Sequence, residues 1–250
     1  MDDLMLRVHL LPDLVEPMAL KDGVVVVIDV LRATTTITTA LEHGAKRVIP
    51  CLEVDEARRV AAEHPQAVLG GERGGCPIPG FHFGNSPAEY RHELINGRTL
   101  VFTTTNGTRA LMRCRAAAAV FIGSFVNLSA VCEAVRAFDS VHLLCAGTNG
   151  QITSEDVLFA GAAVHRLSNM QGDRFAPSRW NDSAQLAFEF WRCRVPNITR
   201  EQVENSLRLS HGGRNLTSLG MQDDITLASQ VDKFSCAPHL NLHSWEIRKS

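Results

Sequence analysis

Short apolar runs recur along the chain and predict the strands of a buried sheet. The clearest run is Val24–Ile28, four valines and an isoleucine. An uninterrupted apolar run of this length is typical of a strand covered on both faces, as in a parallel sheet. The same criterion predicts further strands at Met5–Leu11, Arg47–Cys51, Ala67–Leu69, Leu100–Phe102, Ala118–Ile122 and Val141–Cys145.

Helical stretches lie between most of these strands. The segment that follows Val24–Ile28 has apolar residues near one stripe and ends at Gly44, a residue that stops helices. The pattern predicts helices at Thr34–His43, Val54–Glu63, Ser86–Leu94, Gly107–Arg115, Leu128–Ala137 and Ser154–Leu167. Alternation at this spacing predicts an α/β sandwich with a largely parallel sheet and helices on both faces.

The chain is expected to form one domain. Its 250 residues can bury the core of one large domain, and no linker or internal repeat divides them. The pattern changes after about residue 167, so a helical excursion is expected over residues 168–210. Residues 210–225 contain glycines and are expected to form a loop over the ligand crevice, with an ordinary surface loop as the alternative.

Polar side chains with complementary chemistry follow the first long strand. Asp29 stands at the strand's end, and Arg32, Thr34 and Thr35 come where the next helix begins. A helix N-terminus favours anions, and a nearby carboxylate suits the metal that accompanies a phosphate. The structural alternatives are Thr34 as a helix cap, Asp29 as a turn residue and Arg32 as a solvated ion-pair partner.

Further segments place similar residues after predicted strands. Glycines allow a backbone to approach a ligand closely, and hydroxyls and amides at a strand-to-helix turn can bind anions; plain turns and caps are the alternative. Ligands of open α/β sheets bind beyond the carboxyl ends of the strands. The candidate site residues are therefore Glu72, Arg73, Asn85, Thr104, Asn106, Gly107, either Glu155 or Asp156, and Arg214.

Composition narrows the function classes. The formal net charge of -2 gives no basic footprint, so no nucleic-acid partner is expected. The acidic start and the lack of an apolar run of membrane-spanning length predict a cytoplasmic protein without a membrane partner. Seven scattered cysteines without a C-x-x-C pair predict buried, reduced thiols. The phosphate loop G-x-x-x-x-G-K-[ST] and the hydrolase motif G-x-S-x-G are both missing.

Five motifs carry a resemblance to a known family. VVVVIDVLRATTT, GGERGG with GFHFGNSP, TTTNGT, CAGTNG with SEDVLFAG, and GGRNLTSLGMQDDI resemble, in this order, the motifs of the 2-phosphosulfolactate phosphatase family. The resemblance is weakest over Met170–Pro196. It implies a three-layer α/β/α sandwich with a largely parallel or mixed sheet. It also implies a Mg²⁺-dependent hydrolase that converts 2-phosphosulfolactate, or a related phosphorylated hydroxy acid, to 3-sulfolactate and phosphate.

The chemistry of phosphoryl transfer suggests a role for each residue. Mg²⁺ prefers hard oxygen ligands, for which the candidates are Asp29, Glu72 and Asp156. Arg32 and Arg73 are expected to clamp the phosphate, and Arg214 to meet the acid at the far end. Substrate hydrogen bonds are expected from Thr34, Thr35, Asn85, Thr104, Asn106 and Gly107. The nucleophile is either water activated by the metal or Asp29 itself.

Two other function classes fit the same residues. One is a non-catalytic regulator that binds phosphate or an organic acid, and the other is a phosphotransfer or lyase enzyme acting on a phosphorylated acid. In every class the partner is a small anionic molecule. The sequence leaves open whether the chain forms a homodimer.

Overall fold

A ten-stranded mixed sheet forms the centre of the computed structural model, which describes residues 5–170 and 172–249. Its strands are β1 (Leu6–His9), β2 (Val24–Ile28), β3 (Arg47–Pro50), β4 (Val68–Arg73), β5 (Cys76–Pro77), β6 (Thr99–Thr103), β7 (Ala119–Gly123), β8 (Val141–Cys145), β9 (His239–Asn241) and β10 (Glu246–Arg248). The strand order is β1-β8-β2-β7-β9-β10-β3-β6-β4-β5. Pairing is parallel within β1-β8-β2-β7 and within β3-β6-β4, and antiparallel elsewhere.

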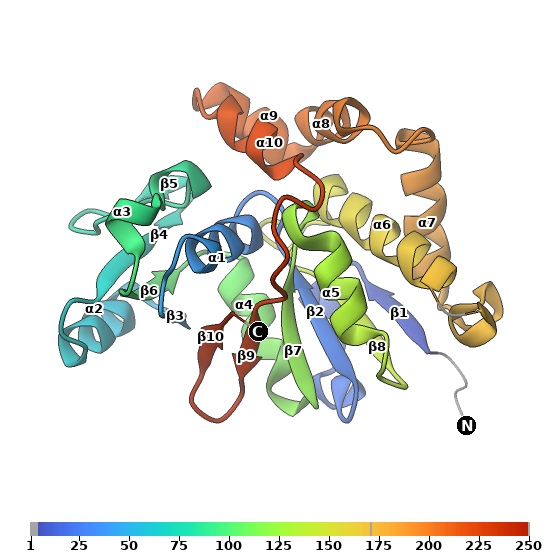
Figure 1. Cartoon of the computed structure of the whole chain (residues 1–250), viewed down its shortest axis with the longest axis horizontal. Helices are drawn as coiled ribbons and strands as arrows, with labels where there is room; N and C mark the ends of the chain where they lie inside the picture. Colours follow the sequence, from blue (N-terminus) through green and yellow to red (C-terminus); the bar gives the residue numbers. More distant parts are fainter. Residues whose placement is uncertain (1–4, 171, 250) are drawn as a thin grey trace.

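Helices surround this sheet (Figure 1). They are α1 (Ala33–Glu42), α2 (Val54–Glu63), α3 (His92–Ile95), α4 (Gly107–Arg113), α5 (Leu128–Val135), α6 (Ser154–Met170), α7 (Asp182–Arg194), α8 (Arg200–Leu209), α9 (His211–Ser218) and α10 (Gln222–Ala228). The predicted helices correspond closely to α1, α2, α4, α5 and α6. The excursion predicted after residue 167 contains α7, which packs along α6, and α8.

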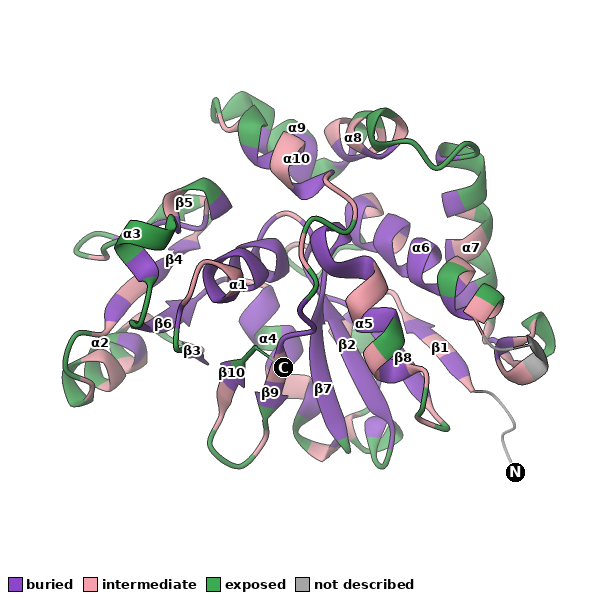
Figure 2. Ribbon diagram, in the orientation of Figure 1, coloured by how far each residue is buried: buried purple, intermediate pink, exposed green. Residues whose placement is uncertain are grey.

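Strand β2 shows why the fold has layers. Val24, Val26 and Ile28 belong to a core with α5, α6 and α7, whereas Val25 and Val27 belong to a core with α1 and α4. Successive side chains of a strand point to opposite faces of the sheet. The apolar run is therefore buried on both faces, as Figure 2 shows for the central strands, and the predicted α/β sandwich is confirmed.

Two predicted local structures were wrong. The helix expected over Ser86–Leu94 is a 3-10 turn at Pro87–Glu89 followed by the short helix α3. Between them, the fully buried Tyr90 points into the core and donates its hydroxyl to the Gly84 carbonyl, 2.6 Å away. Residues 210–225, expected as a loop, instead form α9 and the beginning of α10. The hydroxyl of Ser210 caps α9, where it accepts the N–H of Gly213.

A C-terminal hairpin joins the two parallel parts of the sheet. Strands β9 and β10 pair with each other, β9 also pairs with β7, and β10 also pairs with β3. Leu240 and Ile247 are fully buried between these neighbours. This hairpin was not predicted from the sequence, because strands of three residues are too short to show an alternating pattern.

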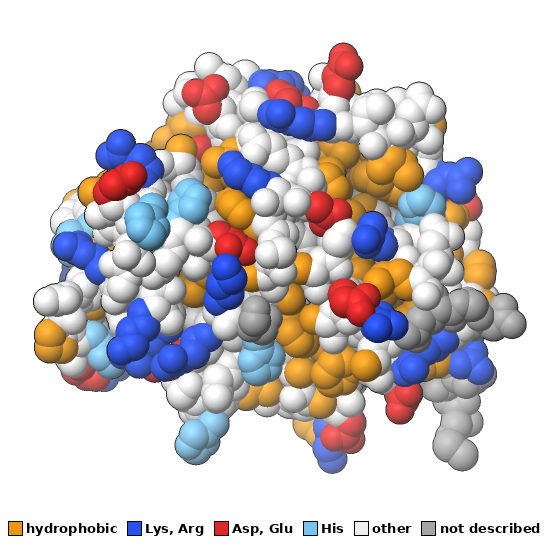
Figure 3. Space-filling model, viewed as in Figure 1, with side chains coloured by type: hydrophobic (Ala, Val, Ile, Leu, Met, Phe, Trp, Pro, Cys, Tyr) orange, Lys and Arg blue, Asp and Glu red, His pale blue; other side chains and the backbone are white. Residues whose placement is uncertain are grey.

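The surface carries no dominant charge on the face in Figure 3, where Lys and Arg side chains are interspersed with Asp and Glu. Throughout the described residues, no helix is long and apolar enough to cross a membrane. All seven cysteines are free. Five are buried as predicted, but Cys76 and Cys193 are exposed.

Two neighbouring histidines lie in the β1–β8 pair. His9 Nε2 and His142 Nδ1 are 2.9 Å apart, and His142 Nε2 lies 3.0 Å from the hydroxyl of Ser140. Burial, with a smaller effect of the Arg7 charge, lowers the pKa of His9 to about 4. Burial, followed by the effects of His9 and Arg7, lowers the pKa of His142 to about 3.

We expect these histidines to make the fold less stable in mild acid. In the unfolded chain they take up protons near pH 6.5, whereas in the folded protein they stay neutral until about pH 4 and about pH 3. The unfolded state therefore binds more protons below about pH 6.5, and the free energy of unfolding falls by up to about 1.4 kcal/mol per pH unit for each histidine. Urea unfolding at neutral and mildly acidic pH measures this loss. His142→Gln should make it smaller, and an unchanged loss in that variant would contradict the assignment.

Candidate active site

Segments that follow four strands open onto one cleft of about 220 Å³. The lining comes from the turns after β2, β6 and β8, the turn between β4 and β5, the loop before the 3-10 turn at Pro87–Glu89, and α9. A cleft of this size suits a small ligand. Five of the predicted site residues line it, namely Asp29, Arg32, Glu72, Asn85 and Asn106.

Asp29 lies where β2 ends and α1 begins. Its Oδ1 accepts the N–H of Ala33 at 3.2 Å, and the Thr34 hydroxyl donates to the Asp29 carbonyl at 2.8 Å. Gly107 forms the adjoining wall, where a Cβ would come 2.9 Å from Asp29 Oδ2 and 2.7 Å from the Ala33 side chain. Position 107 therefore requires a glycine beside the carboxylate.

The surroundings of Asp29 disfavour its negative charge. Burial raises the pKa of Asp29 to about 7, and the nearby charges of Glu72 and Glu155 add to the rise. The N–H of Ala33 and the charge of Arg32 act in the opposite direction. A cation near Asp29 would favour its ionised form, because an opposite charge stabilises a buried carboxylate.

Arg32 is buried and held at three points. Its Nη1 donates to Asp224 Oδ2 at 2.8 Å and to Met221 Sδ at 2.9 Å, and its Nη2 donates to the Gly75 carbonyl at 3.1 Å. Asp224 also accepts the hydroxyl of Ser86 at 2.5 Å. The Nε hydrogen and one Nη2 hydrogen of Arg32 have no partner among the described residues, so one edge of the guanidinium is left for an anion.

Glu72 and Arg73 point in opposite directions, because both belong to strand β4. Glu72 Oε1 accepts the N–H of Thr105 at 2.8 Å, and its Oε2 accepts the N–H of Gly75 at 2.7 Å. The guanidinium of Arg73 donates to the hydroxyl of Thr103 and to the main-chain carbonyls of Leu52 and Glu72, each at 2.8 Å. The structure thus brings Glu72 to the cleft and places Arg73 outside its lining.

Two polar groups in the cleft wall have no hydrogen-bond partner among the described residues. Asn85 is 6% exposed, yet its Oδ1 is unpartnered within the described part of the chain, as is the hydroxyl of Thr105. Asn106, in contrast, accepts the N–H of Asn149 at 3.0 Å across the cleft. Buried polar atoms are nearly always hydrogen-bonded. The unpartnered groups therefore point to a polar ligand in this cleft.

Glu155 and Asp156, at the start of α6, do not line the cleft but hydrogen-bond to main-chain groups of the segments around it. Asp156 Oδ1 accepts the N–H of Val30 at 2.9 Å, and its Oδ2 accepts that of Gly147 at 3.0 Å. Burial and neighbouring carboxylates raise the pKa of Asp156 well above its usual value. Glu155 Oε1 accepts the N–H of Gly212 in α9 at 3.1 Å, and its Oε2 is a buried atom without a partner in the described residues.

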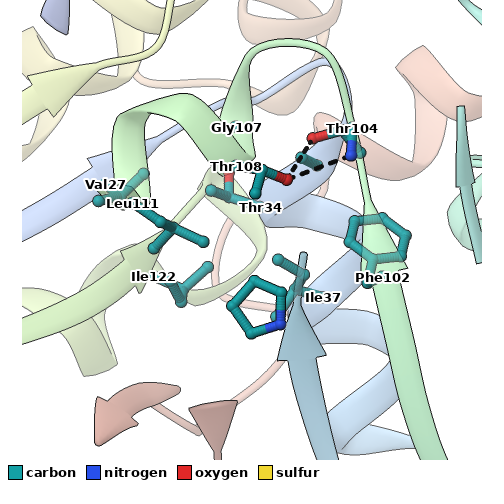
Figure 4. Close-up of a pocket in the computed structure, with 11 residues that line it drawn as sticks. Val27, Thr34, Ile37, Phe102, Thr104, Gly107, Thr108, Leu111 and Ile122 are labelled. Atoms are coloured by element: carbon teal, nitrogen blue, oxygen red, sulfur yellow. Dashed lines mark hydrogen bonds between the residues drawn. The ribbon is translucent and has the colours of Figure 1, made fainter. Parts of the chain in front are cut away.

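Three hydroxyls expected to bind phosphate are used within the turns instead. Thr34 and Thr104, with Gly107, line a separate void of about 10 Å³. Figure 4 shows the hydroxyls of Thr104 and Thr108 directed at each other, among largely apolar side chains. This space is at the lower limit for one water molecule. The hydroxyl of Thr35 donates to a main-chain carbonyl, that of Val30, at 2.8 Å.

Helix α9 turns Arg214 away from the cleft. Arg214 is exposed, and its Nη1 donates to the carbonyl of Leu209. His211 and Asn215, one helical turn apart, line the cleft in its place. These two residues were not among the predicted site residues because a loop was expected here, whereas helical spacing would have put positions 211 and 215 on one face.

The donor chemistry of the cleft fits Mg²⁺. No group of three or more His, Cys, Asp or Glu side chains in residues 5–170 and 172–249 is arranged to hold a metal ion. Mg²⁺, however, is commonly held by one or two carboxylates together with water and substrate phosphate. Asp29 and Glu72 are two such carboxylates in one cleft. Asp156, by contrast, lies outside the lining of the cleft.

Comparison with known proteins agrees with the motifs. The profile of a family described as 2-phosphosulpholactate phosphatase matches residues 9–242. A protein of Symbiobacterium thermophilum named "Probable 2-phosphosulfolactate phosphatase" is 44% identical over 218 residues, which cover 86% of this chain and 90% of that protein. Proteins of the same name from Thermotoga petrophila and Clostridium acetobutylicum are 42% and 36% identical, over 86% and 87% of this chain and 88% and 89% of their own length. The chain therefore belongs to the 2-phosphosulfolactate phosphatase family.

Proposed function

We propose that this chain is a Mg²⁺-dependent phosphatase that hydrolyses 2-phosphosulfolactate, or a closely related phosphorylated hydroxy acid, to 3-sulfolactate and phosphate. The observation that carries the proposal is the turn after β2, which presents the carboxylate of Asp29 and the guanidinium of Arg32 to one cleft. Membership of the family supports a phosphate ester as the substrate.

The residues around the cleft would have different roles in phosphoryl transfer. Mg²⁺ held by Asp29 and Glu72 would neutralise charge on the phosphate oxygens. Arg32 would bind those oxygens through its free edge, since Asp224 and Gly75 fix the other side of the guanidinium. Asp29 would either orient the attacking water or attack the phosphorus itself; in the second case the bond between phosphorus and the ester oxygen breaks, and water then hydrolyses the aspartyl phosphate to release phosphate.

Release of inorganic phosphate from 2-phosphosulfolactate is the direct test. A regulator would bind this compound without releasing phosphate. A phosphotransfer enzyme or a lyase would not give phosphate and 3-sulfolactate in equal amounts. Comparing kcat/KM for phosphoglycolate, phosphoglycerate and 2-phospholactate would identify the preferred acid.

Chelation of divalent cations should abolish most of this activity. We expect kcat to fall by at least about a hundredfold with EDTA, because the loss of the cation removes several kcal/mol of transition-state charge stabilisation. Excess Mg²⁺ should restore the rate. Mn²⁺ should substitute in part and Ca²⁺ poorly, because the larger Ca²⁺ prefers longer bonds and more ligands. Full turnover after exhaustive chelation would refute the role of Mg²⁺.

A further inference from the structure

The cleft offers few positive charges for so acidic a substrate. 2-Phosphosulfolactate carries a phosphate, a carboxylate and a sulfonate. Among the described residues that line the cleft, the side chains able to carry a positive charge are Arg32 and His211. Arg32 is already paired with Asp224 at 2.8 Å, and its free edge is assigned to the phosphate. Among the described residues that line the cleft, His211 is therefore the remaining basic side chain that can meet a second acidic group.

The wall formed by α9 presents N–H donors to the cleft. His211 is the first residue of α9 and Asn215 lies one turn later, so both side chains face the same way. The turn with Gly74 and Gly75 adjoins them, and a Cβ at position 75 would come 3.4 Å from Asn215 Nδ2. The imidazole of His211 and the amide of Asn215 thus border the cleft beside a turn that has no side chains.

The position of α9 is fixed by contacts behind it. The N–H of Gly212 donates to Glu155 Oε1 at 3.1 Å, and Glu155 is only 2% exposed. A Cβ at position 212 would come 2.3 Å from that same oxygen, so the helix can lie this close to α6 only with a glycine there. His211 and Asn215 consequently stand on an anchored helix rather than on a loop.

A second, independent feature of the same cleft points to a ligand. Asn85 is 94% buried, and its amide makes no hydrogen bond with the described residues through Oδ1. Asn85 comes from the loop before the 3-10 turn at Pro87–Glu89, far from α9 in the sequence, yet it lines the cleft with His211 and Asn215. Oδ1 itself can only accept a hydrogen bond, but turning the amide over exchanges Oδ1 and Nδ2 and presents a donor to an anion instead.

We propose that His211, with Asn215 and Asn85, binds the sulfonate of the substrate; this inference rests on the proposed function. A sulfonate is weakly basic and presents three oxygens, which suits several N–H donors. A carboxylate is the better ligand for a hard cation, so it belongs on the side of Asp29 and Glu72. His211 thereby takes the role that the sequence suggested for Arg214.

Two substrates that differ by one group test the proposal. 2-Phospholactate has a hydrogen where 2-phosphosulfolactate has its sulfonate. His211→Ala should lower kcat/KM for 2-phosphosulfolactate by about tenfold to a hundredfold, mainly through KM, because a charged hydrogen bond is lost on binding. For 2-phospholactate the change should be less than about threefold. His211→Arg, which keeps N–H donors at the position, should retain most of the preference for the sulfonated substrate.

Matched controls separate this proposal from the proposed function. Arg214→Ala, at an exposed residue of the same helix that does not line the cleft, should leave the ratio of kcat/KM between the two substrates unchanged. Calorimetry of 3-sulfolactate binding, compared with lactate binding, measures the sulfonate contact in the absence of turnover. The affinity for 3-sulfolactate should be lower in His211→Ala than in the wild type. Equal losses on both substrates, or no loss on either, would overturn the sulfonate assignment. If the wild-type protein releases no phosphate from either compound, the proposed function fails, whereas His211-dependent binding of 3-sulfolactate would still support the contact.

Discussion

Asp29→Asn is expected to lower kcat by about a thousandfold while the protein stays folded. Asparagine keeps the oxygen that accepts the N–H of Ala33, so the start of α1 is preserved. The substitution removes the negative charge, which is needed for a metal ligand and equally for a nucleophile. Loss of such a charge costs about 4 kcal/mol of transition-state stabilisation, a factor of about a thousand in rate.

Steady-state kinetics and circular dichroism of the same sample measure this effect. Asp55→Asn, which changes an exposed carboxylate on α2, is the matched control and should behave as the wild type. Near-normal turnover in a well-folded Asp29→Asn protein would remove Asp29 from the reaction.

Asp224→Ala is expected to have the largest effect on stability. Arg32 and Asp224 are both 4% exposed, and their side chains are 2.8 Å apart. Removing the carboxylate leaves the guanidinium buried without a counter-charge, which should lower the free energy of unfolding by about 3–5 kcal/mol. The hydroxyl of Ser86 loses its acceptor as well. Because Arg32 would also lose its orientation, kcat/KM should fall.

The neighbouring residue supplies the control for this substitution. Asp223 is exposed in the same first turn of α10. Asp223→Ala should cost less than about 1 kcal/mol, the usual worth of a negative charge at a helix N-terminus. Equal free energies of unfolding for the two variants, measured by urea denaturation, would show that the Arg32–Asp224 pair contributes nothing specific.

Much of the fold could be predicted from the sequence because each long element has its own periodic pattern. Val24–Ile28 is apolar at every position and is the buried strand β2, with the same bounds as predicted. The hairpin β9–β10 has no such pattern. Its strands have three residues each and are stabilised by β7 and β3, which lie far from it in the sequence. Pairing between distant segments leaves no local signal.

The candidate site was predicted best where a residue directly follows a strand. Asp29 and Arg32 reach the cleft because the chain leaves the sheet there. Arg73 was expected beside Glu72 because the surrounding glycines suggested a loop, but β4 continues through both residues and alternation separates them. The helical geometry of α9 likewise turns Arg214 outward and brings in His211. The errors thus concern side-chain direction rather than the choice of segment.

The place of the C-terminal hairpin also bears on how the chain folds during synthesis. Residues 239–248 are the last part of the sheet to leave the ribosome, yet they lie in its middle, between β7 and β3. Until they emerge, β7 and β3 each present an open edge, and unpaired edges invite association with other chains. Joining the two halves therefore waits until residues 239–248 have emerged, and nascent chains halted before residue 239 would expose the edges that chaperones protect.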